Sequence, residues 1–144
     1  ATHQVLDDSG WLLTGDIAQM DPDGYFRIVA RKADLWYPNR PDQPAFPRDV
    51  EEVLFEIPQV KEAAVVPVAG QPVAFIIARN SLTAEAVTAY CKRRLPPELV
   101  PRLVIFVDEF PRTFIGKVLR RELAKVLKPG SEKTAGLELT GSGV

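Results

Sequence analysis

The sequence contains almost none of the residues that hold metals or form disulfides. Its 144 residues include one cysteine, Cys91, and one histidine, His3. A disulfide needs two cysteines, a zinc site needs several Cys or His ligands, and a Ser-His-Asp triad needs a histidine placed inside the fold. The sequence therefore predicts no disulfide, no metal site and no such triad, and it favours a reducing, cytoplasmic setting.

Long hydrophobic runs and an excess of charge are also missing. No apolar run approaches the roughly 18 residues that a membrane span requires. The formal net charge is -1, with 46% hydrophobic and 26% charged residues. This balance is that of a globular protein and provides no field to attract nucleic acid, so neither a membrane span nor nucleic-acid binding is expected. The opening residues, ATHQVLDDSGW, do not resemble a targeting segment.

The length is that of about one domain, which is short for an enzyme that binds two substrates. Two apolar runs flank Asp21-Pro22-Asp23-Gly24 within residues 11–31 and predict a β-hairpin. Four prolines in residues 36–47 then predict an extended loop. Further along, the apolar spacing predicts helices at 48–57, from Thr83 to Pro96 and at 117–127, and strands at 62–69, 72–79 and 103–110.

These elements predict an α+β fold, in which a small three-stranded sheet packs with about three helices after the hairpin. Pro67 suggests that its strand lies at a sheet edge or contains a bulge. Cys91 lies on the apolar face of the second helix and is expected to pack in the core. Residues 129–144 are rich in Gly, Ser, Thr and charge, and are expected to be a disordered tail.

Asp16 follows Thr-Gly in the first arm of the predicted hairpin. Its carboxylate oxygens can accept hydrogen bonds from the two hydroxyls of a sugar diol, although Gly-Asp pairs are also common in ordinary turns. Arg31 ends the second arm, where a guanidinium can hold a diol or a phosphate, or simply face solvent. The residues alone favour the ordinary turn.

Lys117 follows Gly116 at the start of the last predicted helix. The helix dipole favours anions at this end, so it does not explain a lysine at this position. A helix N-terminus and a lysine side chain can, however, bind an anion together. By spacing alone, an exposed surface lysine is the commoner case. Trp36, Tyr37 and Phe46 surround the proline loop, where they can form a ligand wall or cover the edge of a core.

Three blocks of sequence, in this order, resemble a known superfamily. They are GWLLTGDIAQMDPDGYFRIVARKADL, FPRDVEEVLFEIPQVKEAAVVPV and VPRLVIFVDEFPRTFIGKVLRREL, within residues 1–127. Together they are similar to the C-terminal portion of adenylate-forming enzymes: acyl-CoA synthetases, peptide-synthetase adenylation domains and luciferases. The resemblance implies that a carboxylate and ATP form an acyl-adenylate with loss of pyrophosphate, after which the acyl group passes to a thiol. It also implies a lid that rotates between the two half-reactions.

The resemblance implies a domain division as well. Residues 1–32 would end a larger N-terminal AMP-binding domain, including the hairpin, and residues 33–128 would form the C-terminal lid. The implied partners are the protein's own N-terminal domain, a carboxylic acid, ATP and CoA. ATP would bind with Mg²⁺, mainly in the N-terminal domain, and CoA would be a cosubstrate.

Individual residues acquire roles from the same resemblance. Asp16 is expected to bind the ribose, and Arg31 to make the second ribose contact. Lys117 would be the catalytic lysine of adenylation, between the acyl carboxylate and the α-phosphate. Gly116 would support the phosphate loop by letting backbone approach the ligand closely. The hinge would lie at Lys32, Ala33 and Asp34.

The sequence departs from the family pattern at the hinge and just after it. Ala33 stands where family members usually have Asp or Lys, and WYPNRPDQPAFP replaces a Gly-rich loop that flanks the path of the thiol. The expected function is the lid of an ATP-dependent acid–thiol ligase, an acyl- or aryl-CoA synthetase, inactive as an isolated fragment. The alternatives are an acyl-AMP ligase that delivers to a carrier protein or stops at the adenylate, and a non-catalytic interaction module that keeps the fold.

Overall fold

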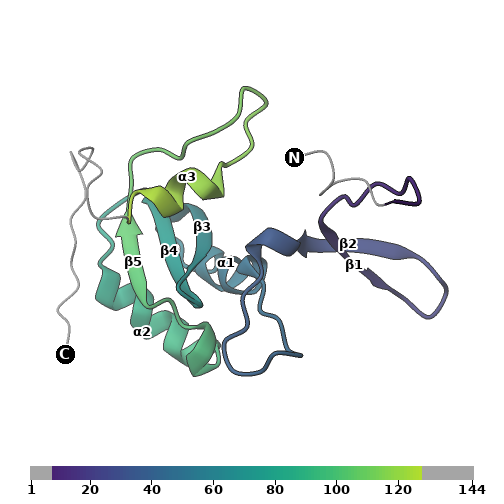
Figure 1. Cartoon of the computed structure of the whole chain (residues 1–144). Helices are drawn as coiled ribbons and strands as arrows, with labels where there is room; N and C mark the ends of the chain where they lie inside the picture. Colours follow the sequence, from purple (N-terminus) through teal and green to yellow (C-terminus); the bar gives the residue numbers. More distant parts are fainter. Residues whose placement is uncertain (1–7, 128–144) are drawn as a thin grey trace.

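A computed structural model describes residues 8–127, which form two separate β-sheets with helices packed around the larger one (Figure 1). The first sheet is the hairpin of β1 (Asp16–Met20) and β2 (Phe26–Arg31), followed by the short 3-10 helix η2 (Lys32–Asp34). The remaining elements are α1 (Pro47–Phe55), β3 (Val60–Val68), β4 (Gln71–Ala78), α2 (Ala84–Arg94), the 3-10 helix η3 (Pro97–Leu99), β5 (Leu103–Phe106) and α3 (Arg120–Lys125). His3 and the predicted tail at 129–144 lie outside the described residues.

The hairpin turns where the sequence predicts it. Asp21 Oδ1 accepts hydrogen bonds from the backbone N–H of Asp23 at 3.0 Å and of Tyr25 at 2.9 Å. Gly24 adopts a φ of 87°, the left-handed conformation that a turn residue without a side chain adopts most easily. The first strand begins at Asp16, later than the predicted start of the hairpin at residue 11. The register places Asp16 directly across from Arg31.

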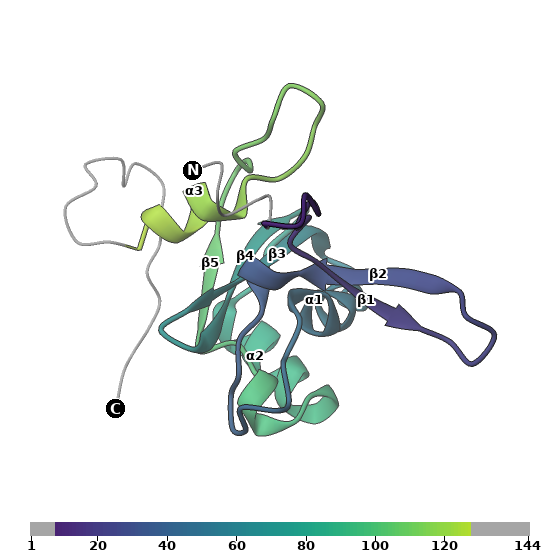
Figure 2. The ribbon, with the colours of Figure 1, turned by 45° about the vertical axis from the view of Figure 1, so that its right-hand side comes forward.

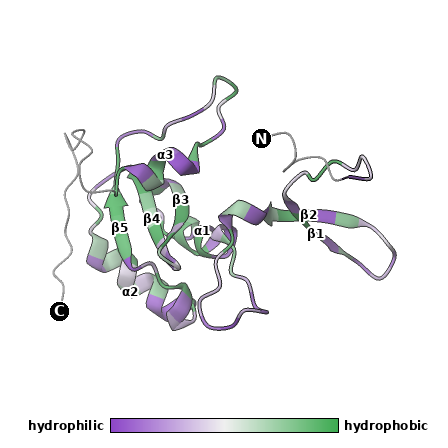
Figure 3. Ribbon diagram, in the orientation of Figure 1, coloured by the Kyte–Doolittle hydropathy of each residue, from purple (hydrophilic) through white to green (hydrophobic). Residues whose placement is uncertain are grey.

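The larger sheet has the strand order β3-β4-β5, with β3 antiparallel and β5 parallel to β4. Side chains alternate between its two faces, as the pleat of a sheet requires. Ile76 faces α1 and α2, whereas its neighbour Phe75 faces α3. Figure 3 shows apolar strands between helices whose polar sides face outward. The α+β prediction of a three-stranded sheet packed with three helices is confirmed.

Local signals explain where α1 and α2 begin. Pro47 occupies the first position of α1, where its missing N–H costs nothing, and Asp49 lies in the first turn. Thr83 caps α2, because its Oγ1 accepts from the backbone N–H of Ala86 at 3.2 Å. Cys91 is fully buried on the inner face of α2, which confirms its predicted place in the core.

The last strand and the last helix are shorter than predicted. β5 ends at Phe106 rather than at residue 110, although Phe110 remains buried. The helix predicted at 117–127 begins only at Arg120, so Lys117 lies in a loop and not at the mouth of a helix. Leu119, predicted to face inward, is 38% exposed. Pairing across the loop between Arg112 and Val118 explains the later start.

The hairpin projects away from the body of the molecule in both ribbon views (Figures 1 and 2). Both hydrophobic clusters draw their residues from the segment between Trp36 and Leu127. The described hairpin residues contribute to neither cluster. The body therefore has a complete core of its own, and the hairpin is joined to it through η2.

Candidate functional site

The start of β1 and the end of β2 form a compact polar unit. Arg31 Nε lies 2.9 Å from Asp16 Oδ1, and Arg31 Nη1 donates to the carbonyl oxygen of Thr14 at 2.9 Å. The backbone N–H of Lys32 donates to the carbonyl of Gly15 at 2.8 Å, which ties the segment before β1 to the end of β2. The structure thus brings Asp16 and Arg31 together in one ion pair.

Asp16 remains available to a ligand despite its ion pair. Its side chain is 22% exposed and that of Arg31 is 52% exposed. The ion pair with Arg31 is made through Oδ1 of the carboxylate. A half-exposed pair of this kind contributes on the order of 0–1 kcal/mol to stability. Its main effect is therefore to orient the two side chains.

Lys117 lies on a tight loop closed by its own hydrogen bonds. The backbone N–H of Thr113 donates to the carbonyl of Lys117 at 2.8 Å, and the backbone N–H of Lys117 donates to Thr113 Oγ1 at 3.1 Å. Gly116 has a φ of 89° and donates to the carbonyl of Thr113 at 2.9 Å. We call residues 111–119 the lysine loop. Its tip, Phe114 and Ile115, is fully or largely exposed.

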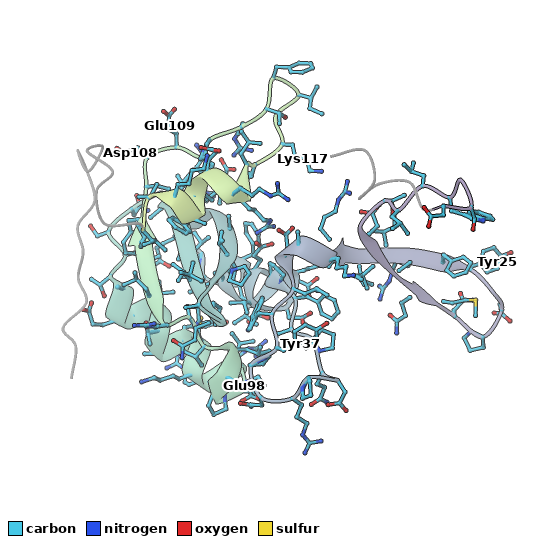
Figure 4. All side chains as sticks on the ribbon, in the orientation of Figure 1. Tyr25, Tyr37, Glu98, Asp108, Glu109 and Lys117 are labelled. Atoms are coloured by element: carbon cyan, nitrogen blue, oxygen red, sulfur yellow. The ribbon has the colours of Figure 1, made fainter. Side chains whose placement is uncertain are left out.

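The lysine loop and the hairpin face a common hollow of about 870 Å³. The hairpin side supplies Thr14, Gly15 and Arg31, and the other side supplies residues 117–122. Figure 4 shows the side chain of Lys117 leaving the loop on the side where the hairpin lies. Asp16 is not among the residues that line the hollow, but it is paired with Arg31, which is. The spacing of the residues does not predict that these distant segments share one opening; only the family resemblance implied it, by assigning both to one nucleotide.

The lining of the hollow favours anions. Five basic residues and two acidic residues line it: Arg31, Lys32, Lys117, Arg120 and Arg121 against Asp34 and Glu122. Arg31 and Arg120 are paired with carboxylates outside the lining, which leaves three basic residues against two acidic ones. A concave surface with an excess of one charge concentrates ligands of the opposite charge. Backbone groups of a polar loop and a lysine together suit a phosphate or a carboxylate.

The predicted hinge residues Lys32, Ala33 and Asp34 form η2, between the hairpin and the body, and line the same hollow. The backbone N–H of Leu35 donates to the carbonyl of Lys32 at 3.4 Å and closes this single turn. Any change in the relative orientation of hairpin and body must be absorbed at or near this turn. The three predicted hinge residues thus lie in a single 3-10 turn between the hairpin and the body.

The aromatic residues around the proline loop divide between the two interpretations of the sequence. Trp36 is 3% exposed and belongs to the core, held by backbone pairing with Ala45. Phe46 is half-buried and lines a second hollow, of about 470 Å³, between the hairpin and α1. Tyr37 is 52% exposed. Trp36 therefore covers a core edge and is not a ligand wall.

Cys91 has no nucleophilic role in this arrangement. Burial among the apolar side chains of α2 and the sheet raises the pKa of its thiol to about 11. A reactive cysteine needs a lowered pKa, which makes it a thiolate at neutral pH.

Among residues 8–127 no group of three or more His, Cys, Asp or Glu side chains is arranged to hold a metal ion.

Two arginines at the site were not identified from the sequence. Arg112 forms an ion pair with Glu62 and donates to the carbonyl of Gly116 at 3.0 Å. Arg120 binds Glu51 from a helix start. Both partners are far away along the chain, and a single sequence has no local signal that pairs them.

None of the helices within residues 8–127 has the length and apolar character needed to span a membrane.

Comparison with known proteins gives a consistent result. Residues 49–117 match the model of the AMP-binding enzyme C-terminal domain. A long-chain-fatty-acid–CoA ligase of Yersinia pestis is 43% identical over 129 residues, which cover 85% of this chain and 22% of the ligase. The o-succinylbenzoate CoA synthetase of Bacillus subtilis, solved with its acyl-adenylate intermediate, aligns with a TM-score of 0.70 at 31% identity, over 83% of this chain and 25% of that one.

ATP-bound MatB from Rhodopseudomonas palustris aligns with a TM-score of 0.75 at 28% identity, over 89% of this chain and 26% of that one. The chain therefore spans about a quarter of the length of the proteins it matches, and its matched segment is their C-terminal domain. Fold, sequence blocks and comparisons agree, and the chain belongs to the family of adenylate-forming, AMP-binding enzymes, of which it carries the C-terminal domain.

Proposed function

We propose that the chain is the C-terminal lid of an ATP-dependent acid–thiol ligase, an acyl- or aryl-CoA synthetase. The observation that carries the proposal is the basic hollow shared by Arg31 and Lys117. Such a ligase forms an acyl-adenylate and then a thioester. The names of the relatives, a fatty-acid–CoA ligase and an o-succinylbenzoate CoA synthetase, support this chemistry.

Lys117 is the catalytic residue of the first step in this proposal. The acid's carboxylate oxygen bonds to the α-phosphorus of ATP and pyrophosphate leaves, so two anions must approach each other. An ammonium group held at the meeting point offsets this repulsion, with an effect on the order of 3–4 kcal/mol by analogy with oxyanion-hole donors. Gly116 supports the role, because a residue without a side chain lets the loop approach a phosphate closely.

Asp16 and Arg31 hold the ribose of the nucleotide. In this proposal Oδ2 of Asp16 accepts a hydrogen bond from a ribose hydroxyl. Arg31 holds the carboxylate through Oδ1 and contributes the second ribose contact. The bond from Arg31 to the carbonyl of Thr14 orients the guanidinium before the ligand arrives. The pair therefore acts as a preorganised diol site next to the lysine.

The larger partner is the protein's own N-terminal domain. Residues 1–32 belong to that domain and residues 33–128 to the lid, with the hinge at Lys32, Ala33 and Asp34. Exposed apolar side chains on the hairpin support the proposal that the N-terminal domain covers this surface, since an isolated two-stranded sheet is marginally stable in water. They are Met20, Tyr25, Phe26 and Ile28, each at least 60% exposed.

ATP binds with Mg²⁺, and CoA is the cosubstrate. In this proposal the Mg²⁺ is bound mainly by the N-terminal domain. The carboxylic acid is also selected there, since relatives that share this domain differ in the acid that their names give. A cytoplasmic location fits both the substrates and the single buried thiol.

An acyl-AMP ligase that delivers to a carrier protein is the second candidate. The specific observation in its favour is the proline loop, whose residue Trp36 is fixed in the core by pairing with Ala45. A stiff loop in place of a glycine-rich one changes the path that a CoA thiol would take.

The experiment that separates these functions uses the full-length enzyme and a broad panel of carboxylic acids. Pyrophosphate release, hydroxylamine-trapped adenylate and acyl-CoA are measured together. A CoA synthetase gives rapid acyl-CoA with at least one acid. Adenylate without acyl-CoA would favour the carrier-specific ligase, and no pyrophosphate with any acid would leave only a non-catalytic interaction module.

A further inference from the structure

Both arms of the lysine loop are anchored to the same edge strand. β3 is at the edge of the larger sheet, so one side of its backbone has no neighbouring strand. Arg112, in the first arm, and Arg120, directly after the second arm, each reach across to this strand or to a residue bound to it. Between them the chain turns through Phe114 and Ile115, which are 102% and 74% exposed, so that little packing fixes the tip.

The anchor of the first arm is Arg112. Its Nη2 forms an ion pair with Glu62, which lies on β3. Its Nη1 donates to the carbonyl of Gly116 at 3.0 Å, one residue before Lys117. The guanidinium therefore links the strand directly to the backbone that precedes Lys117. A lysine in its place has one flexible ammonium group and cannot reproduce this planar two-way contact.

The anchor of the second arm is Arg120, three residues after Lys117. Its Nη1 and Nη2 lie 2.5 and 3.2 Å from the two oxygens of Glu51, on α1, and Nη1 also donates to the carbonyl of Val65 at 2.8 Å. Glu51 Oε1 accepts from the backbone N–H of Val65 at 2.7 Å. The two side chains thus satisfy the backbone N–H and carbonyl of Val65 on the edge strand, as a further strand would.

This second anchor is more enclosed than the other ion pairs found within residues 8–127. The side chain of Glu51 is 13% exposed and that of Arg120 is 28% exposed, compared with 38% and 52% for Glu56 and Arg94, which link α1 to α2. Two-pronged, partly desolvated arginine–carboxylate pairs are the ones that restrict geometry most. The lysine loop therefore starts and ends at fixed points, although its tip is free.

We propose that Arg112 and Arg120, with their partners Glu62 and Glu51, are positioning residues that set the place of Lys117 during adenylation. The inference rests on the proposed function of Lys117. A displacement of about 1 Å of a reacting group can cost on the order of a hundredfold in rate. The arginines themselves act through the loop, and their removal alters a rate only where Lys117 contributes to it.

The test is a double-mutant cycle in the full-length enzyme, read as single-turnover formation of acyl-adenylate. Arg112→Met and Arg120→Met are each expected to slow this step by about tenfold or more, with Arg120→Lys intermediate. In a Lys117→Ala background the same substitutions are expected to change the remaining rate by less than about twofold, because residues that act as a unit are not additive. Thioester formation from supplied acyl-adenylate and CoA should stay within about twofold throughout.

Arg94→Met is the matched control, because it breaks an arginine–glutamate pair of similar length, 2.7 Å, away from the loop. Its adenylation rate should match that of the unaltered enzyme. Equal losses with and without Lys117, or no loss in the unaltered background, would overturn the inference. If Arg120→Met fails to fold in a thermal melt, Arg120→Lys and Arg112→Met decide. A normal rate for Lys117→Ala alone would instead contradict the proposed function.

Discussion

At the scale of single residues, Cys91 shows how burial alone can raise the pKa of a thiol and so keep it protonated. No charged group contributes to its altered pKa; desolvation by the surrounding core is the sole cause. The thiol is neutral at every physiological pH, so it packs as a small apolar side chain. The sequence predicted this place correctly, because the position lies on the apolar stripe of an amphipathic helix.

The pKa of Cys91 predicts a pH dependence of stability. In the unfolded chain the thiol titrates near 9.0, and in the folded chain at about 11. The folded state holds the proton more tightly, so the free energy of unfolding is unaffected below pH 9 and falls as the pH rises from 9 to 11. The loss reaches about 2–3 kcal/mol above that range.

Urea unfolding of the chain and of Cys91→Ala, at pH 8 and pH 11, measures this contribution. Taking the difference between the two proteins removes the contribution of every group that both contain. The advantage of the unaltered chain over Cys91→Ala should shrink with pH. An advantage that is the same at both pH values would show that the thiol does not titrate as proposed.

At the scale of elements, the helices and strands with strong periodicity were predicted well, and the lysine loop was not. Val118 and Leu119 continue the apolar spacing of the following helix, which is why the helix was predicted from residue 117. In the structure, Val118 pairs with Arg112 across the loop, and the helix starts only at Arg120. A pairing between chain segments overrode the local pattern.

Gly116 provides a test of the loop as an element. Its φ of 89° is costly for any residue with a side chain, although a Cβ would meet no atom within 4 Å. Gly116→Ala is therefore expected to strain the backbone by about 1–2 kcal/mol and to slow adenylation several-fold in the full-length enzyme. The measurement is acid-dependent pyrophosphate release, with a thermal melt to confirm folding.

Gly70→Ala is the matched control for this prediction. Gly70 lies in the turn between β3 and β4, has a φ of 75° and likewise has open space around it. It should lose comparable stability and keep its adenylation rate. Equal loss of activity in both variants would mean that general stability, and not the shape of the lysine loop, limits the reaction.

At the scale of the whole molecule, the fold class followed from local patterns, but the site depends on distant pairs. Arg31 and Lys117 are 86 residues apart and line one hollow, and Glu51 and Arg120 are 69 residues apart. No periodicity or turn signal encodes such pairs in a single sequence. The roles of Asp16, Arg31 and Lys117 came from the resemblance of three ordered blocks, and they remain predictions.

The division of the chain predicts that the body folds without the hairpin. Both hydrophobic clusters lie within residues 36–127, and the described residues 8–32 contribute to neither. A chain of residues 33–127 should unfold cooperatively, with a midpoint within about 4 °C of that of the whole chain, because the loss is expected to be below about 1 kcal/mol. Circular dichroism during heating measures it. Loss of the cooperative transition would place the domain boundary elsewhere.

The central claim is that Lys117 brings together the carboxylate and the α-phosphate. Its most direct test is acid-dependent ATP–pyrophosphate exchange by the full-length enzyme carrying Lys117→Ala, beside the unaltered enzyme. Removal of the ammonium should lower the exchange rate by about a hundredfold or more, while thioester formation from supplied acyl-adenylate continues. Exchange at the unaltered rate would contradict the account.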